Sequence, residues 1–181
     1  MSDGDLWVFG YGSLMWNPGF DHDEAVVASL PDYHRSFCMR SIHHRGTEEK
    51  PGLVLALDEQ TGAQCQGLAF RAKAGTYDQT MADLRARELV SSAYLEKRLW
   101  IDLIDGRRVD AVTYVIDPHH VQYCQIDLAE QAHIIAAAVG GRGPNTEYLY
   151  NTASHLTELG IEDDDLSWLS NEVRRLEHQA R

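Results

Sequence analysis

The sequence predicts an α+β fold, because strand and loop patterns dominate its first half and helix patterns dominate its end. Strands and helices do not alternate along the chain as they do in a parallel α/β sheet. The chain has 181 residues, of which 44% are hydrophobic, which is enough to form a core. We therefore expect a single domain over residues 1–181, with its core at about residues 6–173.

The strand predictions depend on short apolar runs bounded by turn residues. The runs are residues 6–9, 53–57, 65–71, 97–104 and 109–116. Gly10 ends the first run and opens a loop. The second and third runs are predicted to form a hairpin through the polar segment 58–62. The fourth and fifth runs are predicted to pair through Asp105-Gly106, a dipeptide that suits a tight turn.

The helix predictions depend on apolar periodicity and on residues that start or stop helices. The predicted helices cover about residues 77–90, 128–139 and 146–159, with a last helix after residues 163–165. Asn145 is a plausible N-cap and Gly160 a plausible residue after the C-terminus of the third helix. The acidic start of the last helix complements its dipole.

Composition excludes several classes of partner. The chain has 16 Lys and Arg against 28 Asp and Glu, a net charge of −12, so neither nucleic acid nor an anionic membrane is an expected partner. A small acidic substrate is compatible with this charge, since a few local amides or one arginine can hold a carboxylate. Three widely spaced cysteines and an N-terminus without a signal-peptide pattern predict a cytoplasmic protein.

A glycine-rich loop follows the first predicted strand and reads Val8-Phe9-Gly10-Tyr11-Gly12-Ser13-Leu14. Glycines let a ligand approach the main chain, and successive amides in such a turn can bind a carboxylate or a developing oxyanion. The loop lacks the further residues of a dinucleotide or phosphate motif, and Ser13 is not in a G-x-S-x-G nucleophile turn. A plain tight turn is the alternative interpretation.

The helix from Tyr77 carries a carboxylate in its apolar stripe. Tyr77, Met81 and Leu84 follow a helical spacing, and the next step of the stripe is Glu88. An inward carboxylate loses hydration, so its pKa should rise toward the range that general acid–base catalysis needs. The alternative is that Glu88 lies at a frayed helix end or pairs with Arg85 or Arg87.

Other polar residues give weaker predictions. Arg45, followed by Gly46, could hold a substrate carboxylate, although a solvated loop is the simpler interpretation. The histidine pairs 43–44 and 119–120 do not have a chelating spacing, so we expect no metal.

Several motifs together resemble the ChaC-like family of γ-glutamylcyclotransferases. They lie at residues 8–16, 44–46, 51–57, 66–70, 87–88 and 143–149, and the resemblance extends from about Leu6 to Val173. It implies a small mixed β-barrel with packed helices. It also implies a lyase-type cyclisation that releases 5-oxoproline and Cys-Gly from glutathione, without a cofactor.

The resemblance also assigns roles to residues. It implies that Glu88 is the catalytic acid–base residue and that the loop from Val8 to Ser13 binds the γ-glutamyl group. The candidate substrate-binding residues are therefore Val8, Phe9, Gly10, Tyr11, Gly12, Ser13 and Leu14, together with Arg45. Gln66 and the segment 92–94 differ from the usual family pattern, which bears on substrate preference. Other γ-glutamyl amines or peptides as substrates, or a non-catalytic ligand-binding module, are the alternatives.

Overall fold

The computed structural model describes residues 4–180 of the chain. Its contacts divide these residues into two compact units. Unit 1 holds the described residues up to Arg35 together with Leu57–His120, and unit 2 holds Ser36–Ala56 and the described residues from Val121 onward. The expectation of one domain over residues 1–181 stays a prediction.

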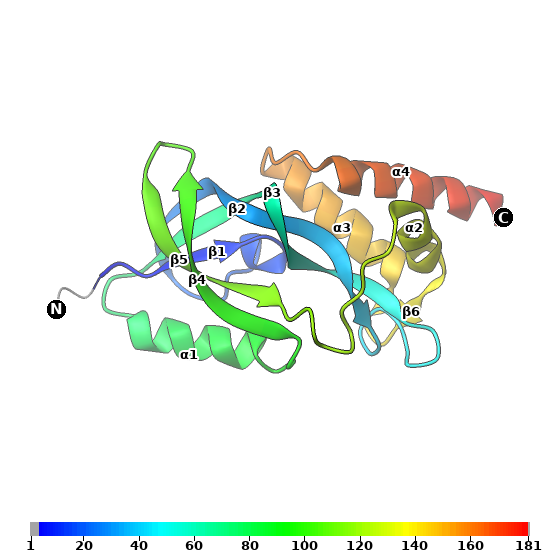
Figure 1. Cartoon of the computed structure of the whole chain (residues 1–181), viewed down its shortest axis with the longest axis horizontal. Coiled ribbons are helices and arrows are strands. Elements are labelled where there is room, and N and C mark those ends of the chain that lie inside the picture. Colours follow the sequence, from blue (N-terminus) through cyan, green and yellow to red (C-terminus); the bar gives the residue numbers. More distant parts are fainter. Residues whose placement is uncertain (1–3, 181) are drawn as a thin grey trace. The chain divides into compact units, whose positions relative to one another are not determined.

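Across the described residues, five strands close into a barrel in the order β1-β3-β2-β4-β5 (Figure 1). The strands are β1 (Trp7–Gly10), β2 (His22–Ser41), β3 (Gly52–Ala72), β4 (Tyr94–Leu103) and β5 (Arg108–Ile116). β1 pairs with β5 in parallel and with β3 antiparallel, so the barrel is mixed. The α+β prediction and the hairpin turning at Asp105-Gly106 are both confirmed, and Gly106 has the positive φ of 96° that such a turn needs.

The predicted hairpin between residues 53–57 and 65–71 is wrong. Both runs belong to the single strand β3, which continues through the polar segment 58–62. That segment lies beside β2, where the Asp32 carboxylate accepts a 2.9 Å hydrogen bond from the Gly62 amide. The polar residues therefore indicate an exposed stretch of a long strand rather than a turn. β2 itself has no clear apolar alternation, which explains why the sequence does not predict it.

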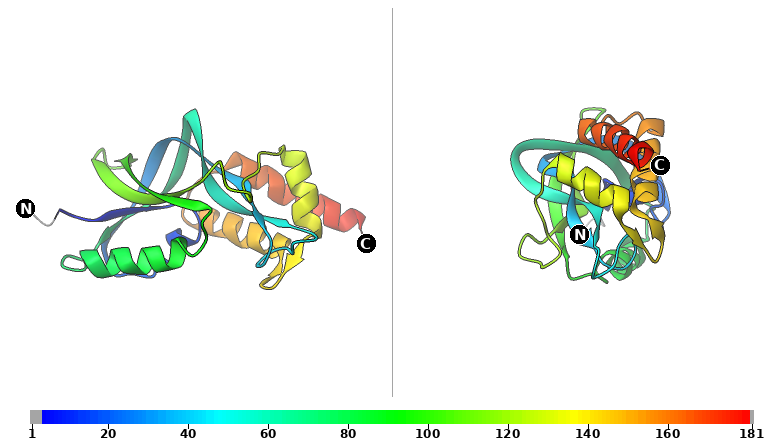
Figure 2. Two further views of the ribbon diagram at one scale, coloured as in Figure 1. Left: turned by 60° about the horizontal axis from the view of Figure 1, so that its bottom comes forward. Right: turned by 90° about the vertical axis from the view of Figure 1, so that its right-hand side faces the viewer.

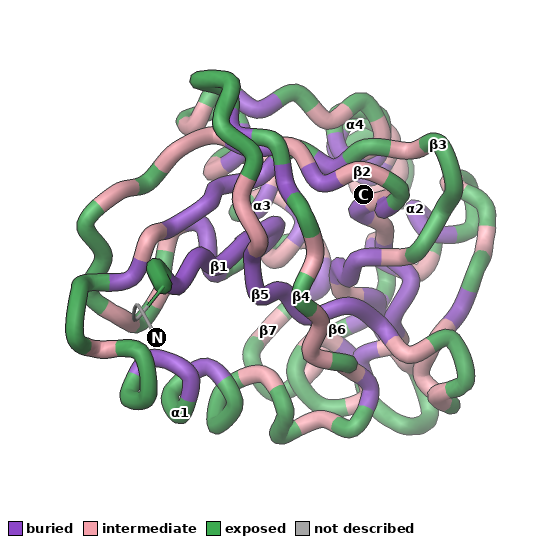
Figure 3. The backbone as a smooth tube through the Cα atoms, turned by 60° about the vertical axis from the view of Figure 1, so that its left-hand side comes forward, coloured by how far each residue is buried: buried purple, intermediate pink, exposed green. Residues whose placement is uncertain are grey.

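β1 is buried along its whole length, as the purple tube of Figure 3 shows. Its register with β3 pairs Gly10 with Leu68. A Cβ atom at the preceding residue, Gly67, would lie 2.2 Å from the Gly10 carbonyl oxygen and 2.8 Å from the Phe9 ring. Glycine at position 67 is thus what lets the two strands approach at the root of the glycine-rich loop.

Helix α1 (Tyr77–Glu88) packs on the barrel through its buried face (Figure 1). Met81 and Leu84 belong to a core cluster with Val8, Leu14 and Tyr114, among other residues. These two members of the predicted apolar stripe are therefore confirmed. Tyr77 is not, since 40% of its surface is exposed at the first turn of the helix.

In unit 2, three helices contact one another (Figure 2). They are α2 (Leu128–Ala137), α3 (Asn145–Glu158) and α4 (Asp164–Gln179), with the short strands β6 (Val139–Gly140) and β7 (Gly143–Pro144) between α2 and α3. Asp163 caps α4 by accepting a hydrogen bond from the Leu166 amide, and Gly160 has a φ of 73° after α3.

Asn145 does not act as the predicted N-cap. It is the first residue of α3, and its buried amide side chain instead exchanges two 2.8 Å hydrogen bonds with the main chain of Leu53. The side chain thus pairs like a strand residue, because the Leu53 main chain would otherwise be buried without partners.

No helix within residues 4–180 is long and apolar enough to span a bilayer. Cys38, Cys65 and Cys124 are buried thiols.

Substitution of Gly67 tests the close approach of β1 and β3. Because the added Cβ would meet a main-chain oxygen that cannot rotate away, we expect Gly67→Ala to lower the free energy of unfolding by about 1–3 kcal/mol. Urea denaturation measures the change. Gly4→Ala is the matched control, because a Cβ at Gly4 would meet nothing within 4 Å. Equal stability of the two variants would contradict the close approach.

Candidate active site

The loop after β1 folds back as a single 3-10 turn, Ser13–Met15. The Met15 amide donates to the Gly12 carbonyl at 2.9 Å, and the Asn17 amide donates to the Ser13 carbonyl at 2.8 Å. A Cβ at Gly10 would lie 3.0 Å from the Leu14 Cβ, so glycine permits this tight return. The amides of Gly12 and Ser13 come before the first hydrogen-bonded amide of the turn. The first N–H groups of a helical turn have no partner within the turn, so they can donate to a ligand.

The candidate residues of the loop divide into two groups. The side chains of Val8, Phe9 and Leu14 are buried, and Val8 and Leu14 belong to the core cluster. Any substrate contact at these three positions would therefore have to involve the main chain. Ser13 is exposed, and its hydroxyl accepts a hydrogen bond from a side chain of α1.

Two buried side chains hold the main chain at the end of β1. Thr113 of β5 donates its hydroxyl to the Phe9 carbonyl at 3.1 Å. Arg35 of β2 donates Nε to the Tyr11 carbonyl at 2.8 Å and Nη2 to the Gln66 carbonyl. Arg35 is only 4% exposed, although arginine is rarely buried to this degree. The start of the loop is therefore fixed from β5, which pairs with β1, and from β2, which lies beyond β3 in the barrel.

Glu88 is the last residue of α1, and only 17% of its side chain is exposed. Burial raises the pKa of its carboxyl group, and the nearby charge of Arg87 acts in the opposite direction. Both interpretations of Glu88 are therefore partly correct. Its side chain is largely buried, as the apolar stripe predicts, and it also lies at the helix end beside Arg87. A carboxylate with a raised pKa is a better match for a general acid–base role than an exposed glutamate is.

Arg87 connects Glu88 to the glycine-rich loop. Its Nε lies 3.5 Å from Glu88 Oε1. Its two terminal nitrogens donate to the Asn17 carbonyl at 2.5 Å and to the Ser13 hydroxyl at 3.0 Å. One guanidinium group therefore touches both the candidate acid–base residue and the candidate binding loop, which places these two predicted parts of the site next to each other.

A second carboxylate nearby has the opposite environment. Glu96 of β4 accepts a bidentate pair of hydrogen bonds from Arg85 and a 2.9 Å hydrogen bond from the Tyr114 hydroxyl. The Arg85 hydrogen bond, followed by that of Tyr114, lowers the pKa of Glu96. Tyr114 also experiences the charge of Glu88, whose pKa is raised. Two neighbouring carboxylates pushed in opposite directions are a common feature of acid–base sites.

Arg45 lies in unit 2 and has an extensive set of contacts there. Its Nη1 donates to the carbonyls of Arg142 and Pro144, each at 3.1 Å, and lies 3.8 Å from Glu147. Its guanidinium group also stacks over Tyr148. These contacts give Arg45 a role in holding unit 2 together, and its assignment to substrate binding stays a prediction.

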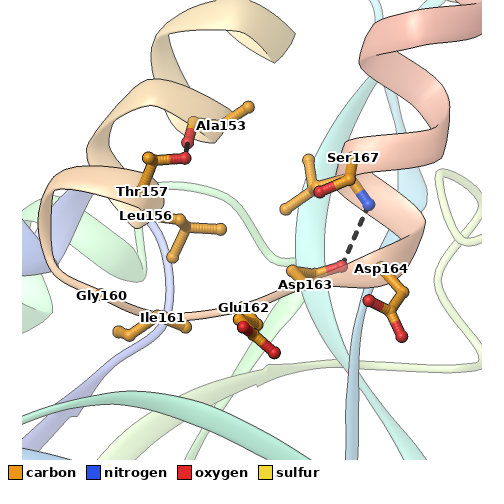
Figure 4. Close-up of a pocket in the computed structure, with 10 residues that line it drawn as sticks. Ala153, Leu156, Thr157, Gly160, Ile161, Glu162, Asp163, Asp164 and Ser167 are labelled. Atoms are coloured by element: carbon orange, nitrogen blue, oxygen red, sulfur yellow. Dashed lines mark hydrogen bonds between the residues drawn. The ribbon is translucent and has the colours of Figure 1, made fainter.

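A cavity of about 510 Å³ lies in unit 2 between the end of α3 and the start of α4 (Figure 4). Its rim carries Glu162, Asp163 and Asp164, and Asp163 is already used in capping α4. An acidic cavity is poorly suited to a substrate that carries carboxylates. Within residues 4–180, no group of three or more His, Cys, Asp or Glu side chains could hold a metal ion.

Comparison with known proteins identifies the family. The chain matches the family described as "ChaC-like protein" over residues 6–176. It is 40% identical to the glutathione-specific γ-glutamylcyclotransferase of Escherichia coli K12, over 96% of this chain and 75% of that protein. It is 35% identical to γ-glutamylcyclotransferase 2-1 of Arabidopsis thaliana, over 94% of this chain and 82% of that protein. The chain belongs to the ChaC-like family.

A solved structure supports the same fold. The crystal structure of a yeast γ-glutamylcyclotransferase specific to glutathione superposes with a TM-score of 0.82 at 20% sequence identity. The superposition covers 97% of this chain and all of the yeast chain, at 100%. The expected mixed β-barrel with packed helices is confirmed.

Three residues of the candidate site make contacts that the sequence does not predict. Thr113 and Arg35 lie on strands and donate hydrogen bonds to main-chain carbonyls of distant residues. The sequence pattern of a strand does not show which of its polar side chains make such bonds. Arg87 is predicted only as a possible partner of Glu88 and as part of the motif at residues 87–88. Its side chain reaches Ser13, which lies 74 positions away in the chain. The helical spacing of residues 77–88 contains no information about such a distant contact.

The raised pKa of Glu88 predicts a pH-dependent stability. The folded protein holds the proton more tightly than the unfolded chain, whose glutamates ionise at about pH 4.3. Stability from this group is therefore fully present below that pH and is lost as the pH rises through the folded-state pKa. We expect Glu88→Gln to become progressively more stable than the wild type as the pH is raised from about 4 to about 7.

Urea denaturation across this pH range measures the difference, with Glu59→Gln at an exposed position of β3 as the control for removing a glutamate. A stability difference between Glu88→Gln and wild type that does not change with pH would contradict the burial of the carboxylate.

Proposed function

We propose that this protein is a glutathione-specific γ-glutamylcyclotransferase of the cytoplasm, releasing 5-oxoproline and Cys-Gly, with Glu88 as its acid–base residue. The observation that carries the proposal is the largely buried Glu88 carboxylate, which Arg87 connects to a loop of main-chain donors. Membership of the ChaC-like family and 40% identity to an enzyme named for this activity support it.

The substrate supplies its own nucleophile in the proposed reaction. The α-amine of the γ-glutamyl group attacks the γ-carbonyl carbon of the same group, and the new C–N bond closes a five-membered lactam. Holding the two tethered groups in a near-attack geometry can lower the barrier by about 7–11 kcal/mol at best. The protein therefore needs no nucleophilic side chain, in agreement with the absence of a nucleophile motif around Ser13.

Glu88 moves the protons. An α-amine is mostly protonated at neutral pH, because its pKa is about 8. The carboxylate of Glu88 accepts this proton, and the raised pKa of Glu88 narrows the gap between proton donor and acceptor. The attacking nitrogen loses a second proton as it becomes the lactam N–H, and the departing nitrogen gains two protons as it leaves as the ammonium group of Cys-Gly. Glu88 relays these two protons one after the other, so it ends the reaction as the carboxylate with which it began.

The glycine-rich loop stabilises the charge that develops on the γ-carbonyl oxygen. The amides of Gly12 and Ser13 are the proposed donors, because they lie at the start of the 3-10 turn. The guanidinium group of Arg87 adds positive charge at the side of the loop. The same amides could hold a substrate carboxylate in place of the oxyanion, and both functions require main-chain donors rather than a metal.

A second candidate function shares this chemistry but differs in the leaving group. Gln66 is exposed on β3 and departs from the usual family pattern, so another γ-glutamyl amine or peptide is the alternative substrate. Comparing turnover of glutathione, γ-glutamyl dipeptides and γ-glutamyl-lysine distinguishes the two. Binding of glutathione without turnover would favour a non-catalytic module instead.

The role of Glu88 predicts the behaviour of an isosteric variant. Glu88→Gln keeps the shape of the side chain but cannot accept a proton, so we expect kcat to fall by about 10²–10⁴-fold while glutathione still binds. Mass spectrometry of 5-oxoproline measures turnover, and calorimetry measures binding. Near-wild-type 5-oxoproline production by this variant would rule out the role of Glu88. No product from the wild type would rule out the activity.

The charge of Arg87 predicts a shift in the pH profile. A general base must be ionised, so kcat/KM should rise with pH through the pKa of Glu88. Because Arg87 lowers that pKa, Arg87→Gln should move the acidic limb of the profile to higher pH. Arg85→Gln is the control, since Arg85 lies on the same helix but pairs with Glu96. Equal shifts in both variants, or none in Arg87→Gln, would contradict the pairing.

A further inference from the structure

Arg35 lies where the pairing of β1 with β3 ends. The last pair of that ladder joins Gly10 to Leu68. Beyond this pair the Arg35 guanidinium group donates to the carbonyl of Tyr11, one residue after Gly10, and to the carbonyl of Gln66, two residues before Leu68. Arg35 therefore continues the hydrogen bonding of the sheet at the point where β1 leaves it to form the loop.

Holding the Tyr11 carbonyl also fixes the direction of the next amide. The carbonyl of Tyr11 and the N–H of Gly12 belong to one planar trans peptide, so they point in opposite directions. With the carbonyl turned toward the buried guanidinium group, the Gly12 N–H must point away from it. Glycine at position 12 tolerates many backbone conformations, so the residue itself does not prevent this peptide from rotating.

We propose that Arg35 is a positioning residue, which locks the Tyr11–Gly12 peptide so that the Gly12 N–H faces the substrate as an oxyanion donor. This inference rests on the function proposed above and extends it to a side chain that does not itself touch the substrate. It gives a reason for the buried guanidinium group of Arg35 to lie beside the loop, because the glycines of the loop do not fix its conformation by themselves.

The geometry requires an arginine rather than another cation. The planar guanidinium group presents nitrogens in fixed directions and here reaches one carbonyl of the loop and one of β3. The single ammonium group of a lysine has no such fork, so Arg35→Lys keeps the charge but should not hold both carbonyls at once. Arg35 exchanges no proton with the substrate in the proposed reaction, so its effect on the rate should not depend on pH.

Steady-state kinetics of Arg35→Lys test the proposal. We expect kcat to fall by about 10²–10³-fold, as for the loss of one oxyanion donor, with little change in KM and no shift of the acidic limb of the pH profile. Arg108→Lys is the matched control, since Arg108 lies on β5 with 63% of its side chain exposed. A role in stability alone would lower the folded fraction but leave the kcat of the folded protein unchanged, which would overturn the proposal.

A measurement on the wild type decides the question if Arg35→Lys does not fold. The product 5-oxoproline is added to protein labelled with ¹⁵N at glycine, with the Gly12 signal assigned through Gly12→Ala. A large shift of the Gly12 amide on binding supports the proposal, and binding without a Gly12 shift overturns it.

The outcomes separate this inference from the proposed function. If the wild type makes no 5-oxoproline from glutathione, the proposed function fails first. If the wild type is active and Arg35→Lys retains its kcat within about threefold, well short of the loss of a donor, then only the role of Arg35 fails.

Discussion

The main-chain carbonyls at the end of β1 are satisfied by side chains of other strands, and the rest of the candidate site depends on this. A buried carbonyl without a partner would be costly, so a strand that stops inside a barrel needs substitutes for the missing ladder bonds. Thr113 and Arg35 provide them at Phe9 and Tyr11. The chain can then leave the sheet at a fixed place and in a fixed direction, and main-chain donors become usable as a binding surface.

Local charge in this protein differs from its global charge. The whole chain carries −12, yet Arg35 and Arg87 both contact the loop that the family resemblance assigns to substrate. The acidic surface therefore does not prevent the binding of an anionic molecule at this point, because close charges outweigh distant, solvent-screened ones. The same arrangement acts on Glu88, because burial raises the pKa of its carboxyl group and the charge of Arg87 partly opposes that rise.

Sequence reasoning predicted the parts of this structure that depend on local patterns. The β4–β5 hairpin, the helices and the inward position of Glu88 all follow from periodicity and turn residues within short windows. It failed where a long-range contact decides the outcome. β3 continues through a polar segment because β2 lies beside it, and Asn145 pairs with Leu53 across 92 positions. The roles of Arg35 and Arg87 are of this kind, since each joins segments that the sequence keeps apart.

The burial of all three thiols has a consequence for an enzyme whose proposed substrate is itself a thiol. Cells that degrade glutathione also contain its oxidised form, which captures accessible cysteines as mixed disulfides. Cys38 is 1% exposed, Cys65 3% and Cys124 9%, so these thiols are poorly placed to attack a disulfide from solvent. Burial therefore limits the formation of mixed disulfides on this protein when the proportion of oxidised glutathione rises.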